Sequence, residues 1–329
     1  MNIVHIGYGY WGANVVRNIK RCSSFKLAAI CDMNTAHLKK AKALYGDNMR
    51  YEESYREFLD SPDISAFVLA VQTEPSFEIA KEILDAGKHL FIEKPIATNA
   101  GRAQILADMA KEKGLILHCD HIMIYHPIIR HIKKIIDEGE LGDITSIEVS
   151  RANLGPVRRD VNAMMDLAVH DIAVIDYLTN GKEPLSVHAV GEMHYGQQET
   201  LTFLTMKYDG FIAHIKSSWV SPVKERTTLV CGTKKMVIFD DLRGMDKLSI
   251  FDRGLIRHED GDEYGLYEYK VRTGDIVVPY IPQEDALLNS VEHFANCIKT
   301  NSPPLSGGEQ SVKVMKVLDK AHACLREAM

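Results

Sequence analysis

Residues 3–12 read Ile3-Val4-His5-Ile6-Gly7-Tyr8-Gly9-Tyr10-Trp11-Gly12, an apolar run followed by three glycines in the spacing G-x-G-x-x-G. This order is typical of a buried strand that turns sharply into a helix and binds a dinucleotide. Gly7 permits the turn, Gly9 lets the backbone approach a pyrophosphate, and Gly12 lets the helix pack close to the strand. The first backbone N–H groups of the helix then donate hydrogen bonds to the phosphates. The residues expected to bind the cofactor here are Gly7, Gly9, Tyr10, Trp11 and Gly12.

A second predicted strand, residues 26–31, ends at Asp32, twenty residues after Gly12. A carboxylate at this position can accept hydrogen bonds from both hydroxyls of an adenosine ribose, and it repels a 2′-phosphate. The next residues, Met33 and Asn34, include no arginine that could hold such a phosphate. The sequence therefore predicts that the cofactor is NAD(H) rather than NADP(H).

The chain has 329 residues, about twice the length of a typical domain, so two domains are expected. Its composition, 46% hydrophobic and 26% charged, is ordinary for a globular protein, and its formal net charge of −6 argues against nucleic acid or an anionic membrane as partner. No apolar run approaches the ~20 residues that span a bilayer, and no signal stretch precedes the first strand. We expect a cytoplasmic protein with a small-molecule partner.

Six cysteines are scattered over the chain, at positions 22, 31, 119, 231, 297 and 324. None of them has the paired spacing that zinc sites or redox dithiols use. We expect buried, reduced thiols and no bound metal.

Residues 1–120 alternate short apolar runs with longer amphipathic stretches, as at 64–71, 76–86 and 89–92. Repeated strand–helix–strand units of this kind favour a parallel doubly wound sheet. Residues 99–113 have apolar side chains at helical spacing, and residues 115–119 follow as a further strand. We predict that residues 1–120 form the NAD-binding Rossmann domain.

Residues 121–329 have a different pattern, with strands expected at 144–151, 186–190, 201–206, 211–215 and 228–231. Hairpin-like spacing predicts an antiparallel sheet with one face covered. Helices are expected at 126–139, 166–178, 284–299 and 309–327, and the polar residues 243–274 predict a long loop or hairpin. The fold class is therefore α/β plus α+β, with a C-terminal substrate domain over residues 121–329.

The segment before Pro95 ends with Glu93 and Lys94 at the carboxyl end of a predicted parallel strand, where open α/β sheets place ligands. Near a positively charged nicotinamide, the Lys94 amine can give or take a proton, or polarise a hydroxyl. A lysine in this place is also typical of a solvated loop. Pro95, which restricts the backbone, favours a shaped site.

Asp166 and His170 are four residues apart, so that on a helix they share one face. A histidine oriented by a carboxylate is the usual general base for a hydroxyl proton. A surface pair on a helix is an equally open interpretation. Asp171 could replace Asp166 as the partner, or cap the helix.

Three segments, GYGYWG at residues 7–12, GKHLFIEKP at 87–95 and DLAVHD at 166–171, resemble the glucose–fructose oxidoreductase, inositol dehydrogenase and MocA family. The resemblance implies a Rossmann domain joined to a mostly antiparallel sheet whose open face makes a homodimer or homotetramer. It also implies NAD(P)-dependent oxidation of sugar or cyclitol hydroxyls. Lys94, Asp166 and His170 match the family's catalytic positions.

The run 71–77, Val-Gln-Thr-Glu-Pro-Ser-Phe, departs from the family pattern, in which a threonine-proline pair is followed by a histidine. Phe77 cannot donate a hydrogen bond, so the polar contacts of this loop are altered. Gln72 and Glu74 are the candidates to replace them. We expect Gln72, together with Glu93 and Lys94, to bind the cofactor.

Residues 151–162 are similar to members that act on nucleotide-linked sugars, particularly 3-dehydrogenases of UDP-N-acetylglucosamine and its uronate. Arg158 and Arg159 could grip a diphosphate, although a charged loop paired with its own surface is equally compatible. Trp219 could line the same pocket, but a core position is more typical.

We therefore hypothesise NAD-dependent oxidation of a secondary hydroxyl, at C3, of a nucleotide-linked amino sugar. Lys94, Arg158, Arg159, Asp166 and His170 would contact this substrate. A free cyclitol or monosaccharide dehydrogenase is the alternative, and a non-catalytic NAD(H) sensor is a third reading.

Overall fold

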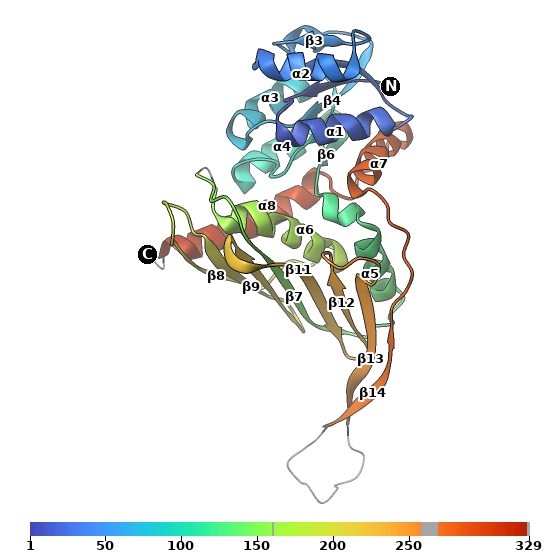
Figure 1. The fold of residues 1–329 in the computed structure, drawn as a ribbon, viewed down its shortest axis with the longest axis vertical. Helices are drawn as coiled ribbons and strands as arrows, with labels where there is room; N and C mark the ends of the chain where they lie inside the picture. Colours follow the sequence, from blue (N-terminus) through green and yellow to red (C-terminus); the bar gives the residue numbers. More distant parts are fainter. Residues whose placement is uncertain (160, 258–268, 328–329) are drawn as a thin grey trace, which may run out of the picture. The chain divides into compact units, whose positions relative to one another are not determined.

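The computed structural model describes residues 1–159, 161–257 and 269–327 (Figure 1). The chain forms two compact units, each of which combines segments far apart in the sequence. Unit 1 contains residues 1–126 and 284–316, and unit 2 contains residues 127–283 and 317–329.

Unit 1 is built on a six-stranded sheet in which every neighbouring pair is parallel, in the order β3-β2-β1-β4-β5-β6. This order confirms the predicted doubly wound sheet. The strands are β1 (Asn2–Ile6), β2 (Lys26–Cys31), β3 (Arg50–Glu52), β4 (Ile64–Leu69), β5 (His89–Ile92) and β6 (Leu117–Cys119). The helical segments between them are α1 (Tyr10–Arg21), α2 (Thr35–Tyr45), η1 (Arg56–Phe58), α3 (Thr73–Asp85), α4 (Ala100–Glu112) and, after β6, η2 (Ile122–Tyr125).

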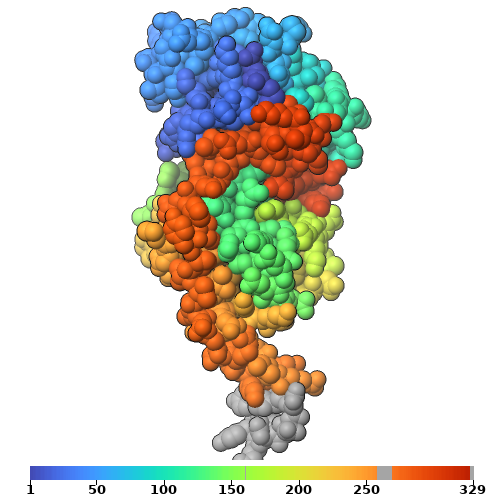
Figure 2. Space-filling model, turned by 90° about the vertical axis from the view of Figure 1, so that its right-hand side faces the viewer, coloured from blue at the N-terminus to red at the C-terminus, as the bar shows by residue number. Residues whose placement is uncertain are grey.

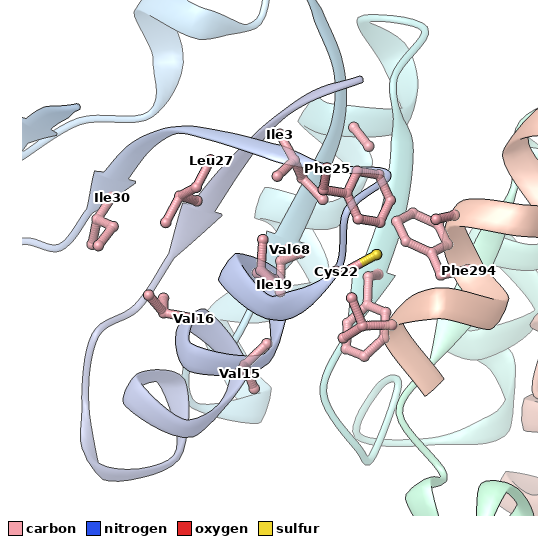
Figure 3. Packing of buried hydrophobic residues seen from close by; sticks show 14 of the residues in the cluster. Ile3, Val15, Val16, Ile19, Cys22, Phe25, Leu27, Ile30, Val68 and Phe294 are labelled. Atoms are coloured by element: carbon pink, nitrogen blue, oxygen red, sulfur yellow. The ribbon is translucent and has the colours of Figure 1, made fainter. Parts of the chain in front are cut away.

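The chain returns to unit 1 near its C-terminal end through α7 (Ala286–Thr300), which packs on α1 (Figures 1 and 2). Asp285 starts this helix by accepting hydrogen bonds from the backbone N–H groups of Leu287 and Leu288. Phe294 of α7 lies with its ring centroid 5.7 Å from that of Phe25, in a core shared with α1 and the sheet (Figure 3). A sequence-distant helix thus completes the core of unit 1.

Unit 2 is built on an eight-stranded sheet in the order β14-β13-β12-β11-β7-β10-β9-β8. All its neighbouring pairs are antiparallel except β7 with β10, which are parallel. The predicted, mostly antiparallel sheet is confirmed. Its strands are β7 (Ile144–Leu154), β8 (Ser186–Glu192), β9 (Leu201–Lys207), β10 (Ile212–Ser218), β11 (Val220–Gly232), β12 (Met236–Asp240), β13 (Leu248–Arg257) and β14 (Tyr269–Val277).

One face of this sheet is buried, as the strand alternation requires. In β9 and β10, buried Met206 lies opposite buried Ala213, and Leu204 lies opposite Ile215. Helical segments of unit 2 lie along the sheet (Figure 1), and one of them, η3, packs on β9 and β10. These segments are α5 (Pro127–Asp137), η3 (Met164–Ala168) and α6 (Val169–Leu178), while the last helix, α8 (Gly308–Glu327), begins in unit 1 and ends in unit 2.

The polar region 243–274 contains most of β13 and β14, which pair as an antiparallel hairpin, although residues 258–268 lie outside the described part. The six cysteines are free thiols, four of them buried and two partly exposed. In the described ranges, no helix is long and apolar enough to cross a membrane, and no cluster of three or more metal-ligating side chains occurs.

Candidate active site

The turn from β1 to α1 needs two of its glycines for steric reasons. Gly7 has a φ of +93°, and a Cβ there would lie 2.3 Å from the carbonyl oxygen of Ala70. A Cβ on Gly12 would lie 2.0 Å from the carbonyl oxygen of Gly7. Gly9, by contrast, faces open space, and no side chain caps α1. The turn therefore has the room and the N-terminal helical donors that a pyrophosphate needs.

Asp32 follows β2 and is held by three donors. Its carboxylate accepts hydrogen bonds from the backbone N–H groups of Tyr8 (2.6 Å) and Asn34 (2.8 Å) and pairs with Nδ1 of His37 (2.9 Å). Burial acts to raise the pKa of Asp32, but these donors outweigh it and lower the pKa. The ionised carboxylate is fixed in place, and the neighbouring Met33 is exposed. His37, five residues further on, is a contact that our sequence analysis missed.

Gln72 precedes the first turn of α3, just beyond the carboxyl end of β4. In the same loop, Glu74 forms an ion pair with Nη1 of Arg102 at 3.0 Å. Phe77 is buried, and the Arg102 guanidinium lies 5.0 Å from the centre of its ring. Arg102 therefore contacts both Glu74 and Phe77 of this altered loop. The contact of Gln72 with the cofactor stays a prediction.

Glu93 and Lys94 lie directly after β5, at the carboxyl edge of the sheet, as predicted. The Lys94–Pro95 peptide is cis. The indole Nε1 of Trp11 donates to Oε1 of Glu93, so the first turn of α1 contacts the strand end that carries Lys94. Tyr10, the first residue of α1, is exposed.

Asp166 and His170 do lie on a helical segment, but its winding differs from the expected α-helix. Residues Met164–Ala168 form the π-helix η3, and His170 lies in the first turn of α6. Single π-turns are rare and often occur at functional sites. Because a π-turn is wider than an α-turn, the face shared by Asp166 and His170 cannot be read from the 3.6-residue period.

Asn162 supports the start of η3. Its Oδ1 accepts a hydrogen bond from the backbone N–H of Met165 (2.9 Å), and its Nδ2 donates to Glu199 (2.9 Å). Asn162 is buried, so these two hydrogen bonds are shielded from water. The sequence signal for them was an asparagine two residues before the π-helix, which we did not use.

Asp171 does not cap α6; it pairs instead with Arg151 of β7. The guanidinium Nη2 lies 2.7 Å from Oδ1 of Asp171, and Nε donates to both carboxylate oxygens. The two side chains are 13% and 3% exposed. This buried fork joins the helix that carries His170 to the middle of the sheet.

Arg158 and Arg159 are both exposed, in the segment between β7 and η3, and Asp160 lies outside the described residues. Arg158 donates to Oδ1 of Asp166 at 3.0 Å, and its side chain is 46% exposed. Trp219 is a buried residue of unit 2, in agreement with the core interpretation. The fold of unit 2 thus brings the side chains of Arg158 and Asp166 into contact, and Asp166 precedes His170 by four residues in the sequence.

The family model of the GFO/IDH/MocA oxidoreductases with an NAD-binding Rossmann fold matches residues 1–121. The model of the GFO/IDH/MocA C-terminal domain matches residues 129–238. The chain belongs to this family. This Gfo/Idh/MocA protein is therefore an NAD-dependent oxidoreductase, as the sequence predicts, and the glycine turn and Asp32 provide a site that fits the cofactor.

Among curated proteins, this Gfo/Idh/MocA chain is 27% identical to UDP-N-acetylglucosamine 3-dehydrogenase of Acidithiobacillus ferrooxidans, over 77% of this chain and 76% of that protein. It is 23% identical to myo-inositol 2-dehydrogenase of Thermotoga maritima, over 94% and 91% of the two chains. With two other relatives, the match spans only about half of their length.

Among solved structures, the fold is similar to that of UDP-N-acetylglucosamine 3-dehydrogenase GnnA from Acidithiobacillus ferrooxidans, with a TM-score of 0.81. The identity is 23%, and the comparison covers 99% of this chain and 98% of that one. At this identity the likeness concerns the fold.

Proposed function

We propose that the protein oxidises a secondary hydroxyl, at C3, of a nucleotide-linked amino sugar such as UDP-N-acetylglucosamine or its uronate. The observation that carries this proposal is the exposed pair Arg158 and Arg159, which precedes the helical segment with Asp166 and His170. The similarity to a UDP-N-acetylglucosamine 3-dehydrogenase over three quarters of both chains supports it.

Bound NAD supplies the acceptor for the hydride that leaves the sugar carbon. The turn at Gly7, Gly9 and Gly12 and the carboxylate of Asp32 are the groups proposed to hold the cofactor. Lys94 and His170 are the two candidates to accept the hydroxyl proton, and Asp166 is proposed to orient the histidine.

The ion pair of Arg158 with Asp166 does not prevent Arg158 from binding a diphosphate. Ion pairs of this exposure contribute about 0–1 kcal/mol, so the guanidinium is released at small cost. A diphosphate offers more negative charge and more acceptor oxygens than one carboxylate does. Substrate binding would then leave Asp166 available to His170.

The test is the formation of NADH with a panel of UDP-N-acetylglucosamine, its uronate, free glucose and inositol. We expect turnover with a UDP-sugar, and we expect KM to rise at least tenfold in Arg158→Ala and Arg159→Ala. Lys182→Ala is the control, an exposed lysine of the same unit that is remote in sequence from the candidate site. Turnover of UDP-sugars that is unchanged in both arginine variants would contradict the role of the arginines.

A free cyclitol or monosaccharide dehydrogenase is the second candidate, and the same ion pair favours it. If the substrate lacks a diphosphate, Arg158 serves to hold Asp166 rather than the substrate. Turnover of inositol or glucose, with no turnover of UDP-sugars, would establish this alternative. Tight NADH binding without hydride exchange on any sugar would indicate a sensor.

We also propose that the protein acts in the cytoplasm as a homodimer or homotetramer, formed through the open face of the unit 2 sheet. On that face, Val190 lies opposite Phe203, and Val190 and Ile212 are 59% and 45% exposed. Light scattering should give at least twice the chain mass, and the mass should fall in Val190→Glu. Leu44→Glu, an exposed position in unit 1, is the control, and a monomeric wild type would contradict the proposal.

A further inference from the structure

Two carboxyl groups meet where β5 and β6 end. The parallel register pairs Ile92 with Cys119, so Glu93 and Asp120 are the next residues on two neighbouring strands. Asp120 donates its backbone N–H to the carbonyl of Ile92 at 2.8 Å, which continues the pairing by one residue. The roles proposed above make no use of Asp120.

Asp120 is fully buried and incompletely satisfied as a carboxylate. Its Oδ1 accepts a hydrogen bond from the Ser290 hydroxyl of α7 at 2.8 Å. Within the described residues, its Oδ2 has no donor partner. Glu93, which is partly exposed, accepts a hydrogen bond from the Trp11 indole on Oε1 and also interacts with the backbone N–H of Lys94. A proton held between the two side chains would satisfy Oδ2 and remove the repulsion between two like charges.

The surroundings favour one shared proton over two separate negative charges. Burial, followed by the neighbouring charge of Glu93, raises the pKa of Asp120 well above its ordinary value. Burial also raises the pKa of Glu93 to about 7, although Asp120, Trp11 and Lys94 act in the opposite direction. The cation Lys94 thus stabilises the ionised form of both groups.

Burial favours the neutral form of four other titratable residues near the pair. Burial, and then the charge of Lys94, lowers the pKa of His121 to about 3, and burial lowers the pKa of His118. Burial raises the pKa of Cys119 and Tyr125 above their ordinary values. The charge state of the pair therefore responds mainly to changes of charge near Lys94.

On the buried side of the pair, Asp120 hydrogen-bonds to a serine, which in turn hydrogen-bonds to a histidine. Ser290 uses its hydrogen for Asp120, so Nε2 of His118, 2.9 Å from the Ser290 oxygen, is the donor to Ser290. The His118 ring stacks on Phe91 at 4.7 Å between centroids and is buried. Exchange of the proton with the site is thus expected through partly exposed Glu93 rather than through this interior.

We propose that Glu93 and Asp120 form a carboxylic acid–carboxylate pair that stores one proton beside Lys94 and loses it when the oxidised, positively charged cofactor binds. A positive nicotinamide at the carboxyl ends of the strands adds a second cation to the surroundings of the pair and stabilises the form with two negative charges. The reduced cofactor has a neutral ring and lacks this effect.

The pair then becomes the place where the substrate proton ends, a step that rests on the proposed function. Bound NAD would supply the acceptor for the hydride, which takes the electron pair of the substrate C–H bond, and the substrate carbon would become a carbonyl. Lys94, as an ammonium, would give one of its protons to the carboxylates and take up the O–H proton of the substrate in its place, so Lys94 ends the step with its charge unchanged. The pair thereby regains the proton that it released when NAD⁺ bound, so protons and charge balance over the cycle.

The first experiment measures proton release on cofactor binding, without any sugar, by a pH indicator in weakly buffered solution near pH 7. We expect NAD⁺ to release up to one proton more per site than NADH does, because the phosphate contacts are common to both. Asp120→Asn, which keeps the shape and offers an amide donor to Glu93, should abolish this difference. Glu82→Gln is the matched control, since Arg56 and Tyr55 lower the pKa of that carboxylate.

Ser290→Ala is a second variant that leaves both carboxyl groups in place. It removes a donor to the ionised form of Asp120, so the pH at which NAD⁺ releases the proton should rise by roughly one unit. Infrared spectra of the cofactor-free protein should contain the C=O band of a protonated carboxylic acid that shifts in D₂O and is lost in Asp120→Asn.

Equal proton release by NAD⁺ and NADH in the wild type would overturn the proposal, as would a difference that persists in Asp120→Asn or the absence of the acid band. These measurements use only the cofactor. A wrong substrate class would therefore show in the sugar panel while proton release stays as expected, and the two failures are distinguishable.

Discussion

The buried ion pair of Arg151 and Asp171 gives the sharpest stability prediction. Arg151→Met removes the guanidinium that binds both carboxylate oxygens and leaves Asp171, which is 3% exposed, without its counter-ion. Breaking a buried pair from one side costs about 3–5 kcal/mol, because the remaining charge stays in a poorly solvating environment. We therefore expect the free energy of unfolding of unit 2 to fall by about this amount.

The assay can isolate unit 2, because the chain has two tryptophans and they lie in different units. In a Trp11→Phe background, the fluorescence of buried Trp219 follows urea unfolding of unit 2. Arg243→Met is the matched control in the same unit. It breaks a pair with Asp240 in which the arginine is 52% exposed, so a loss of about 0–1 kcal/mol is expected.

A double variant separates the charge from the packing. Arg151→Met combined with Asp171→Asn removes the buried charge, so it should be more stable than Arg151→Met alone by at least about 1 kcal/mol. A loss in Arg151→Met no larger than in Arg243→Met would refute the reasoning. So would a double variant less stable than the single one.

Four further predictions concern the chemistry, the cofactor and the pH dependence of stability. Lys94→Met and His170→Ala should each lower kcat by orders of magnitude in stopped-flow turnover, and His170→Ala should retain its NAD affinity in an NADH fluorescence titration. A wild-type rate in either variant would remove that residue from the mechanism. Gly12→Ala should abolish NAD binding in calorimetry, because its Cβ would lie 2.0 Å from the Gly7 carbonyl oxygen. Gly244→Ala, with no atom within 4 Å of the added Cβ and no positive φ, should bind normally. Asp32→Ala should weaken NAD binding at least tenfold and narrow the preference over NADP. Since the folded-state pKa of Asp32 is lowered, its contribution to stability is present above the unfolded-state pKa of about 4 and is lost as the pH falls through the folded value. The midpoint temperature of thermal unfolding should therefore fall more steeply between pH 6 and pH 3 in the wild type than in Asp32→Ala. Parallel curves of this temperature against pH would contradict the prediction.

Much of unit 1 was predictable because its signals are local. The turn at Gly7 and the contact of Gly12 are steric requirements between residues close in sequence, and both are met. Asp32 directly follows the last residue of β2, at the carboxyl end of the strand, as predicted. The alternation of short apolar runs and amphipathic stretches predicted the parallel strands.

The candidate site in unit 2 was less predictable. Asp166 and His170 were expected on one α-helical face, and the π-helix at residues 164–168 changes the angle between them. The pair formed by Arg151 with Asp171 joins the β-strand β7 to the helix α6, which are separate elements of the chain. No periodicity encodes such a contact.

The sequence by itself determined the glycine turn, the acidic residue after β2, the strand–helix alternation and the cofactor type, because each depends on backbone sterics or on a period within one segment. Only the tertiary structure decided that α7 completes the core of unit 1, that β7 pairs in parallel with β10, and that Glu93 and Asp120 become neighbours. Strand order and register are chosen by the packing of the whole chain, and many orders are compatible with the same local pattern. The shared environment of the two carboxyl groups therefore exists only in the folded protein.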